Sequence, residues 1–440
     1  MILPIRMIGL VMLLIFCLLV PNAYAPVVSI ENTISARYSV RNWTSENISS
    51  SQLVEVLRAA YGYRGDYRSL PQVGISYSLT LFVANTTGTY RYIPEQNALT
   101  IHDISVNKET ILPYFDSNAD ANAVIVIVWN KTRMDNQYYA SAEAGLVTQN
   151  IYLAAVSQNL GTVCVGTINS NSLRNDLKLP STMTPLLIMP LGYPTNPYPS
   201  TSPDYTRMTG NLPPVQISQN SFSNVLDNLR YTQTWSVKNL TTQELSQLLW
   251  AAVGYSSTGH RTVPSAYGVY PIEIWFLNAT AAYKYNPQTH SVTLRLQGDK
   301  RLEISNVFGS QNWAANAPTV FIAVYDSSMG GDGGVVLHAF VEVDAGTIVQ
   351  NILLEATAWD LSGNVISQGL EAWNGTGASS IRSILGMSPS LIPLYAVPVG
   401  HVEPIPEFPS ALILIALMML VSALAIAFRR KMAILDNQIG

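Results

Sequence analysis

Three polar side chains alternate along a short segment near the start of the 440-residue chain: Arg37, Ser39 and Arg41. In an extended segment, alternate residues point to the same side. Two guanidinium groups and a hydroxyl would then converge, and such a set suits a phosphate because arginine offers forked, charge-assisted donors. Short basic motifs are common, so the segment taken alone is better explained as two solvated arginines.

Other chemistries have little support in the sequence. The five histidines are dispersed without the spacing of metal ligands, and neither a Ser-His-Asp set nor a pair of catalytic carboxylates can be assigned. Of the two cysteines, Cys17 lies in the apolar N-terminal segment, and Cys164 is better explained as a small buried hydrophobe than as a nucleophile. The formal net charge of −4 gives no reason to expect a nucleic acid partner.

The chain contains two divergent copies of one domain. Four short segments of the first half recur in the second half in the same order, and the spacing between copies grows only slowly, as loop insertions would cause. The matched segments begin at Leu57 and Leu249, at Tyr90 and Tyr283, at Ala144 and Ala345, and at Pro190 and Pro398. A repeat of this length is a whole domain. A fused pair can form within one chain the two-fold interface that a homodimer forms between two chains.

Each copy has the same predicted order of helices and strands. An amphipathic helix leads into a Gly-rich turn, alternating strands and a buried strand follow, and a long apolar helix containing Gln-Asn comes next. The predicted helices span residues 51–60, 141–158, 243–252 and 341–358, and the predicted strands include 76–83, 123–129, 271–277 and 319–325. Helices and strands mix without strict βαβ alternation, which predicts the α+β class. The two Gln-Asn helices are apolar on most faces, so we expect them to be buried where the copies meet.

The two ends of the chain have the composition of targeting segments. Residues 1–25 have the order of a secretory signal, or remain as an N-terminal anchor. Residues 411–428 are apolar and precede three cations, which predicts one membrane-spanning helix with the body outside the cell and a cytoplasmic tail over 429–440. The PEFP stretch at 406–409 resembles the sequence before the C-terminal anchor of many archaeal surface proteins. Between the ends we expect a first domain over 35–194, a linker rich in Pro, Ser and Thr over 195–218, a second domain over 219–401 and a spacer over 402–410.

The ordered motifs resemble those of the nitroreductase-like flavoprotein family. The likeness rests on the Arg-x-Ser-x-Arg segment, an Ala-Ala-x-Gly helix end, a Pro-Ser-Ala-x-Gly turn, the Gln-Asn helix, the Gly-rich turn 161–166 and Leu-Gly-Tyr-Pro at 191–194. Within the family, the likeness is closest to the peptide dehydrogenases that oxidise thiazoline and oxazoline rings. The resemblance implies a three-layer α+β fold that dimerises by helix packing and binds two FMN molecules at the interface.

The two copies keep different halves of the site that this resemblance implies. In the family, the Arg-x-Ser-x-Arg segment and a late basic residue hold the FMN phosphate, and the Pro-Ser-Ala-x-Gly turn approaches the flavin from the partner subunit. The first copy keeps the phosphate segment but has Pro-Gln-Val-Gly at 71–74, while the second keeps the turn and degrades the phosphate segment to 230–234, with Arg230 aligned to Arg37. The resemblance therefore implies one retained FMN site shared by the copies. Its candidate residues are Arg37, Ser39, Arg41, Arg207, Gly161, Gly166, Pro264, Ser265, Ala266 and Gly268.

These features together favour an FMN-dependent oxidoreductase, anchored at the cell membrane of an archaeon and working as an intramolecular pseudo-dimer. Its expected substrate is a small molecule or a peptide-like molecule. Reduced nicotinamide is scarce outside cells, so a dehydrogenase fits the expected location better than a conventional nitroreductase. Two alternatives stay open, namely a non-catalytic surface protein that kept the fold as a binding module, and flavin binding without turnover.

Overall fold

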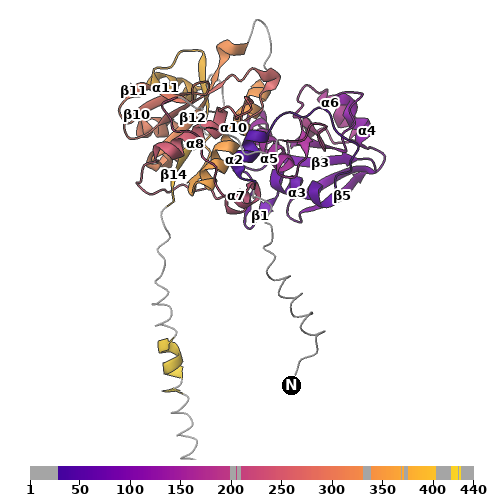
Figure 1. The fold of residues 1–440 in the computed structure, drawn as a ribbon, viewed down its shortest axis with the longest axis horizontal. Helices are drawn as coiled ribbons and strands as arrows, with labels where there is room; N and C mark the ends of the chain where they lie inside the picture. The colour runs from indigo at the N-terminus through magenta and orange to yellow at the C-terminus, as the bar shows by residue number, and fades with distance from the viewer. Residues whose placement is uncertain are drawn as a thin grey trace, which may run out of the picture. The chain divides into compact units, whose positions relative to one another are not determined.

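The computed structural model describes residues 28–198, 205, 210–330, 338–367, 369–370, 375–402, 418–424 and 426–427. The chain divides into two units, Met1–His401 and Val402–Gly440, and both sequence copies lie in the first unit (Figure 1). The predicted signal or anchor over 1–25 lies outside the described residues, as does Arg207.

Each copy contains a six-stranded sheet, and the two sheets have the same strand order. The orders are β5-β4-β3-β6-β8-β7 and β11-β10-β9-β12-β14-β13, with all neighbouring strands antiparallel. The first sheet comprises β3 (Leu79–Asn85), β4 (Gly88–Ile93), β5 (Ala98–Asp103), β6 (Ala123–Asn130), β7 (Gly161–Thr162) and β8 (Met183–Gly192). The second comprises β9 (Ile272–Leu277), β10 (Ala281–Asn286), β11 (Ser291–Gln297), β12 (Thr319–Asp326), β13 (Leu361–Gly363) and β14 (Leu391–His401). The shared order confirms the tandem repeat and the α+β class.

All four predicted helices are present in the described chain. α3 (Ser50–Tyr61) and α8 (Thr242–Val253) each begin with a capping box, in which the side chain of Ser49 or Thr241 accepts a hydrogen bond from a backbone N–H three residues later. The long Gln-Asn helices are α5 (Gln137–Ser157) and α10 (His338–Ala358), and 17 of the 21 residues of each are buried. A helix that is apolar all round must be covered on every side, as was expected for a contact between the copies.

Two short helices, α2 (Ile30–Ala36) and α7 (Phe222–Asn228), are absent from the prediction. Each begins at a serine cap, Ser29 or Ser221, and each ends directly before the predicted phosphate segment or its counterpart. Seven residues are too few for helical periodicity to be recognised in sequence. The other short elements are β1 (Tyr63–Arg64), β2 (Tyr67–Arg68), α4 (Lys108–Ile111), α6 (Ser170–Asp176), α9 (Arg301–Ser305) and α11 (Thr376–Leu385).

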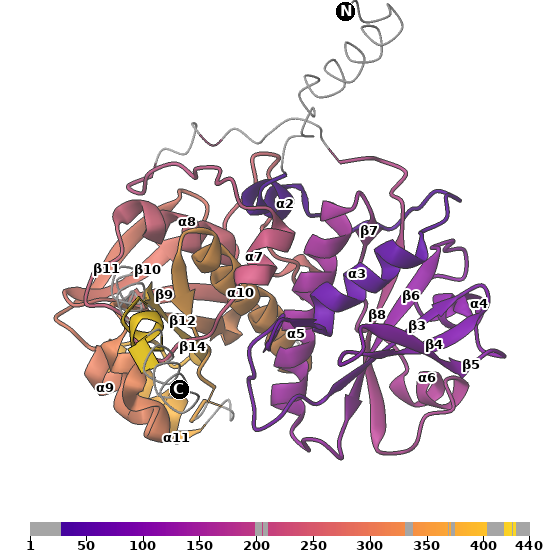
Figure 2. The same cartoon turned by 90° about the horizontal axis from the view of Figure 1, so that it is seen from below.

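Each copy has three layers, because its sheet is covered on both faces. Along β3, Leu81 and Val83 belong to the core shared with α5 and α10, whereas Phe82 and Ala84 belong to a separate outer core. The outer core of the first copy includes side chains of α4 and α6, and that of the second includes side chains of α9 and α11. Figure 2 shows α5 and α10 side by side between the two sheets. The central core therefore belongs to both copies at once.

The two central helices cross at a pair of glycines. A Cβ atom built on Gly145 would lie 2.1 Å from the carbonyl oxygen of Val343, and one built on Gly346 would lie 2.2 Å from that of Ala142. Only glycine permits backbones to approach this closely. The contact repeats symmetrically in the two helices, so it places the approximate two-fold axis of the repeat at this crossing.

The Gln-Asn pairs form a buried network beside the crossing. Gln149 Nε2 donates to Asn351 Oδ1 at 2.7 Å, and Gln350 Nε2 donates to Asn150 Oδ1 at 2.9 Å. The asparagines in turn donate to backbone oxygens, Asn150 to Ser69 O at 2.9 Å and Asn351 to Ala251 O at 2.8 Å. Each amide thus bonds across the interface or back into its own copy, which fixes the register of one helix against the other.

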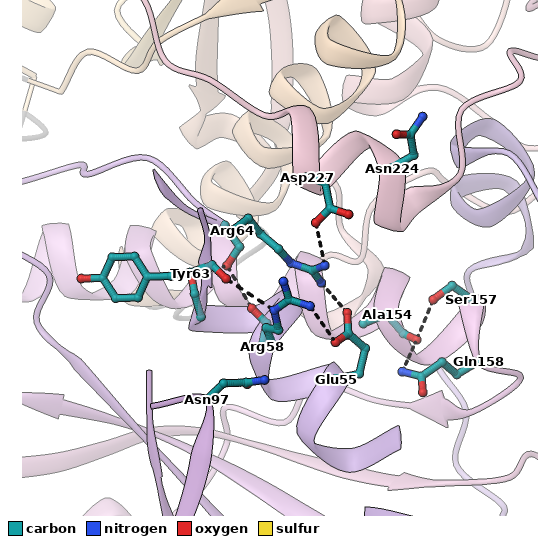
Figure 3. Close-up of polar contacts among 12 residues, drawn as sticks. Glu55, Arg58, Tyr63, Arg64, Asn97, Ala154, Ser157, Gln158, Asn224 and Asp227 are labelled. Atoms are coloured by element: carbon teal, nitrogen blue, oxygen red, sulfur yellow. Dashed lines mark hydrogen bonds and ion pairs between the residues drawn. The ribbon is translucent and has the colours of Figure 1, made fainter. Parts of the chain in front are cut away.

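An ion pair near the edge of this interface also joins the copies (Figure 3). The side chain of Arg64 on β1 is 3% exposed and contacts Glu55 of α3 at 2.5 Å and Asp227 of α7 at 2.9 Å. Asp227 belongs to the second copy and is about half exposed, so solvent screens its contribution. Burial of the central helices therefore supplies more of the interface stability than this ion pair.

The described part of the C-terminal unit corrects the predicted location. No helix among the described residues is long and apolar enough to cross a membrane, which contradicts the predicted location as a single-pass membrane protein. Of the predicted spanning segment 411–428, residues 411–417, 425 and 428 lie outside the described residues. All of the predicted tail 429–440 lies outside the described residues, as does the spacer 402–410 except Val402.

Separating the copies should expose the central helices. We expect residues 27–213 produced alone to self-associate or aggregate, because α5 would then present an uncovered apolar surface to solvent. Residues 27–403 serve as the matched control and should remain a compact monomer at the same concentration. Size-exclusion chromatography with light scattering decides between them. A monomeric first half with the melting temperature of the longer fragment would show that the interface is dispensable.

Candidate functional site

A cavity of about 690 Å³ lies between the two copies. Ser39 and Arg41 line it from the first copy, and the turn from Pro264 to Gly268 lines it from the second. The start of α10 contributes Phe340 and Asp344 to the same wall. The structure thus brings together most of the residues that the sequence assigned to a single shared site.

Ser39 and Arg41 offer donors at one end of this cavity. Ser39 Oγ lies 3.1 Å from the hydroxyl of Tyr152, which in turn accepts a hydrogen bond from the backbone N–H of Cys164 at 2.8 Å. The Arg41 side chain is exposed and makes one long bond, from Nη1 to the carbonyl oxygen of Ser39 at 3.4 Å. Among the described residues, no carboxylate forms an ion pair with Arg41. A hydroxyl and a cation without a carboxylate partner suit an anionic group such as a phosphate.

Arg37 does not line the cavity, contrary to the predicted convergence of three side chains. It is 3% exposed, donates from Nη2 to the carbonyl oxygen of Arg261 at 2.8 Å, and lies 5.2 Å from the ring centre of Tyr152. Desolvation lowers the pKa of this guanidinium. The prediction was wrong because the backbone of the second copy binds this guanidinium, through the carbonyl oxygens of Arg261 and Val263, instead of leaving it free for the cavity. Its observed contact is with the backbone that leads into the second-copy turn.

The second-copy turn is held open toward the cavity. Its residues Ala266–Gly268 form a short 3₁₀ turn, in which Tyr267 and Gly268 have left-handed φ angles of 55° and 70°. A Cβ atom built on Gly268 would have no heavy atom within 4 Å, so its backbone faces open space. A backbone this bare allows close approach by a flat ligand.

Asp344 anchors this turn and is absent from the sequence-based site. Its Oδ2 accepts a hydrogen bond from Ser265 Oγ at 2.5 Å, and its carboxylate also accepts one from the backbone N–H of Ala266 at 3.2 Å. Desolvation raises the pKa of Asp344 to about 7, although both hydrogen bonds oppose the rise. The repeat carried a signal for this residue, since Glu143 precedes Ala144-Gly145 just as Asp344 precedes Ala345-Gly346.

The predicted glycines have different positions. Gly166 lines the cavity, and a Cβ atom there would lie 2.4 Å from the ring of Phe340. Gly161 instead packs against Val40, and its carbonyl oxygen accepts a hydrogen bond from Trp43 Nε1 at 2.8 Å. Gly161 therefore supports the strand edge rather than the cavity.

Cys164 lies in the cavity wall but has the properties of an inert thiol. Burial raises its pKa to about 12, so the thiolate is scarce at neutral pH. This agrees with its assignment as a small hydrophobe.

The structure corrects the alignment of the degraded phosphate segment by one residue. Trp43 and Trp235 occupy equivalent positions, because each donates from Nε1 to a backbone oxygen at the start of the short strand β7 or β13. Counting back from them, Arg37 corresponds to Leu229 rather than to Arg230, and Arg41 corresponds to Gln233. The second copy therefore keeps neither arginine.

Two positions that line the cavity in the first copy carry larger side chains in the second copy. Tyr231 stands where the first copy has Ser39, and its hydroxyl donates to the carbonyl oxygen of Arg68 at 3.4 Å. Ser367 stands where the first copy has Gly166, and its hydroxyl donates to the carbonyl oxygen of Val73. Larger side chains thus occupy positions that small ones leave open in the first copy.

Comparison with known proteins gives the same family for both copies. The sequence profile of the nitroreductase family matches residues 34–193 and 234–401. A protein of Methanocaldococcus jannaschii that carries the name nitroreductase is 34% identical over 182 residues, which is 38% of this chain and 91% of that protein.

Solved structures show the fold. A crystal structure of a protein from Anabaena variabilis, also named as a nitroreductase, aligns with a TM-score of 0.64 at 15% identity over 85% of this chain and 100% of that one. The microcin synthetase complex of E. coli aligns with a TM-score of 0.33 at 18% identity, over 36% of this chain and 70% of that chain. The second likeness is too low to assign a branch of the family.

Proposed function

The chain belongs to the nitroreductase family, and from that premise we propose that the cavity between its copies binds FMN and that the protein is an FMN-dependent oxidoreductase. Proteins of this family generally bind this flavin. The observation that carries the proposal is that Ser39 and Arg41 of one copy line the same cavity as residues 264–268 of the other. The corresponding positions on the opposite side hold Tyr231 and Gln233, so the proposal is limited to one site per chain.

The residues around the cavity fit FMN at both of its ends. Arg41 and Ser39 would hold the phosphate, because their donors are the ones that charge-assisted phosphate binding requires. Gly268 would admit the flat ring system, since it has no side chain and its backbone faces open space. Phe340 adds an apolar surface to the same wall.

Bound FMN would supply the capacity to exchange a pair of electrons with a substrate, which the side chains of this cavity lack. The protein's own residues would bind, orient and shield. Arg37 and Asp344 position the second-copy turn, one through the carbonyl oxygen of Arg261 and the other through Ser265. Tyr114 and Phe115 line the cavity from the first copy and would restrict the access of water. We propose a small molecule or a peptide-like molecule as the substrate.

Flavin stoichiometry tests this proposal. The purified protein, reconstituted with FMN, should bind one flavin per chain, as measured by its visible absorbance. Arg41→Gln should weaken binding by roughly tenfold or more, because it removes a charge-assisted contact of about 1.5–3 kcal/mol. The matched control is Gln233→Ala at the corresponding position of the second copy, which should leave the affinity unchanged.

Three outcomes would contradict the proposal. A protein that binds no FMN would favour a non-catalytic binding module. Two flavins per chain would show that the opposite side of the interface, with Tyr231 and Gln233, also binds FMN. If Gln233→Ala loses FMN affinity and Arg41→Gln keeps it, the second copy holds the phosphate, which contradicts the assignment to the first copy.

A further inference from the structure

A second cavity, of about 550 Å³, lies entirely within the second copy and shares no residue with the cavity assigned to FMN. Its wall is formed by the turn that follows α8, the start of β9 and the hairpin of β10 and β11. Its charged and aromatic lining residues include Tyr255, Arg261, Tyr270, Glu273, Lys284 and Arg295. We call it the Arg261 cavity. Its volume is in the range of cavities that bind small organic molecules.

In the first copy, the protein's own side chains occupy the region that corresponds to the Arg261 cavity. There Tyr61, at the last position of α3, is 1% exposed, and its hydroxyl donates to Glu143 at 2.6 Å. Arg68, the counterpart of Arg261, donates from Nη1 to the carbonyl oxygen of Tyr61 at 2.8 Å and from Nη2 to Glu95 at 3.3 Å. The side chain of Arg68 is 8% exposed. A tyrosine and a carboxylate of the protein itself therefore occupy this place in the first copy.

Both groups are missing from the second copy. Val253 ends α8 where Tyr61 ends α3, and a small cavity of about 10 Å³ remains beside Val253 and Asp344. Gln288 stands at the position of Glu95, in a turn that follows the same Tyr-x-Tyr-x-Pro segment. The second copy thus has the arginine of the first copy without the carboxylate that binds it.

Two tyrosine rings position the guanidinium of Arg261. It lies 4.8 Å from the ring centre of Tyr255 and 4.8 Å from that of Tyr270. Its Nε is buried without a hydrogen-bond partner, and among the described residues no carboxylate forms an ion pair with it. Two aromatic rings restrict the faces of the guanidinium, so its edge is the part that can bind.

We propose that the Arg261 cavity binds a small organic carboxylate, whose carboxylate group pairs with Arg261 as Glu95 pairs with Arg68. An arginine edge matches the two oxygens of a carboxylate. The charges of the cavity agree with an anion, because Lys284 pairs with Glu273 and leaves Arg261 and Arg295 beside the single acid Asp326. The two tyrosines would contact the remainder of the ligand. This proposal does not depend on the binding of FMN.

Benzoate and its uncharged analogue benzamide are suitable probes for the full-length protein. Saturation-transfer NMR should detect benzoate binding and little benzamide binding, because only benzoate carries the charge that Arg261 binds. Arg261→Gln should weaken benzoate binding at least tenfold.

Gln288→Glu keeps Arg261 and provides the sharpest test. It restores the carboxylate of the first copy, so the protein's own side chain should pair with Arg261 and weaken benzoate binding at least tenfold. Gln96→Glu adds the same charge to the exposed turn of the first copy and should have no effect.

The proposal is overturned if benzoate and benzamide bind equally, or if benzoate binding survives both Arg261→Gln and Gln288→Glu. It is also overturned if neither benzoate nor acetate binds to the wild-type protein. Circular dichroism of each variant separates loss of the site from loss of the fold.

Discussion

Replacing Gly145 with alanine should lower the free energy of unfolding by about 3 kcal/mol, at the upper end of the range for overpacked cores. The new methyl group would lie 2.1 Å from the carbonyl oxygen of Val343, which is main chain and cannot rotate away. The helices α5 and α10 would have to separate, and the buried hydrogen bond from Gln149 to Asn351 would lengthen as they do. Chemical denaturation followed by tryptophan fluorescence measures the change.

Two further variants identify the helix crossing as the cause. Gly346→Ala should destabilise by a similar amount, because its methyl group meets the carbonyl oxygen of Ala142 in the same way. The double variant should cost less than the sum, since helices that are already separated can accept a second methyl group. Gly65→Ala is the control, because its site is open and the substitution costs only the strain of a left-handed backbone, about 1 kcal/mol. Equal stability of Gly145→Ala and wild type would contradict the close crossing.

The wild-type protein should lose stability as the pH rises, because of Asp344, and Asp344→Asn should abolish this part of the pH dependence. Burial raises the pKa of Asp344 from 3.8 to about 7 in the folded protein. Between these values the unfolded chain releases a proton that the folded protein retains, so rising pH favours unfolding. The stabilising contribution is complete below about pH 4 and is lost as the pH passes through 7. The full difference is on the order of 4 kcal/mol.

The comparison of two pH profiles isolates this residue. Burial also raises the pKa of Glu143 and of Glu355, but both remain in the wild type and in the variant and so cancel. From pH 4 to 8, the free energy of unfolding of Asp344→Asn should therefore rise relative to that of the wild type. Asp299→Asn is a control of opposite sign, since the hydrogen bond from Arg301 lowers the pKa of Asp299 and restricts its effect to acid pH. Parallel profiles for Asp344→Asn and wild type would show that Asp344 is ionised in the folded protein.

The long helices and the repeat were predictable because each leaves a signal spread over many residues. α5 and α10 extend over 21 residues each, and the matched segments of the copies constrain one another. Local features were harder to predict. The sequence places Arg37 on the same side as Ser39 and Arg41, but it cannot reveal that the guanidinium donates to the carbonyl oxygen of Arg261, 224 residues away.

The site also contained residues that spacing alone could not identify. Asp344 lies nearly 80 residues from Ser265 in sequence, and only the fold brings the two within hydrogen-bond distance. Sequence likeness predicts Arg230 as the counterpart of Arg37, because the two side chains are chemically the same, although Leu229 is the true counterpart. Hydrogen bonds from Trp43 and Trp235 fixed the true register. Chemical likeness is thus a weaker guide to alignment than a shared contact.

The glycine crossing has a consequence for how the protein is made. A ribosome adds roughly 5–20 residues per second, and Gly346 follows Gly145 by about 200 residues, so α5 waits on the order of 10–40 s for its partner. During that interval nothing in the nascent chain can cover the face that α10 will occupy. The protein is therefore most prone to aggregate during synthesis, after the first copy has emerged and before α10 has. A chaperone that binds apolar helices would matter most in that interval.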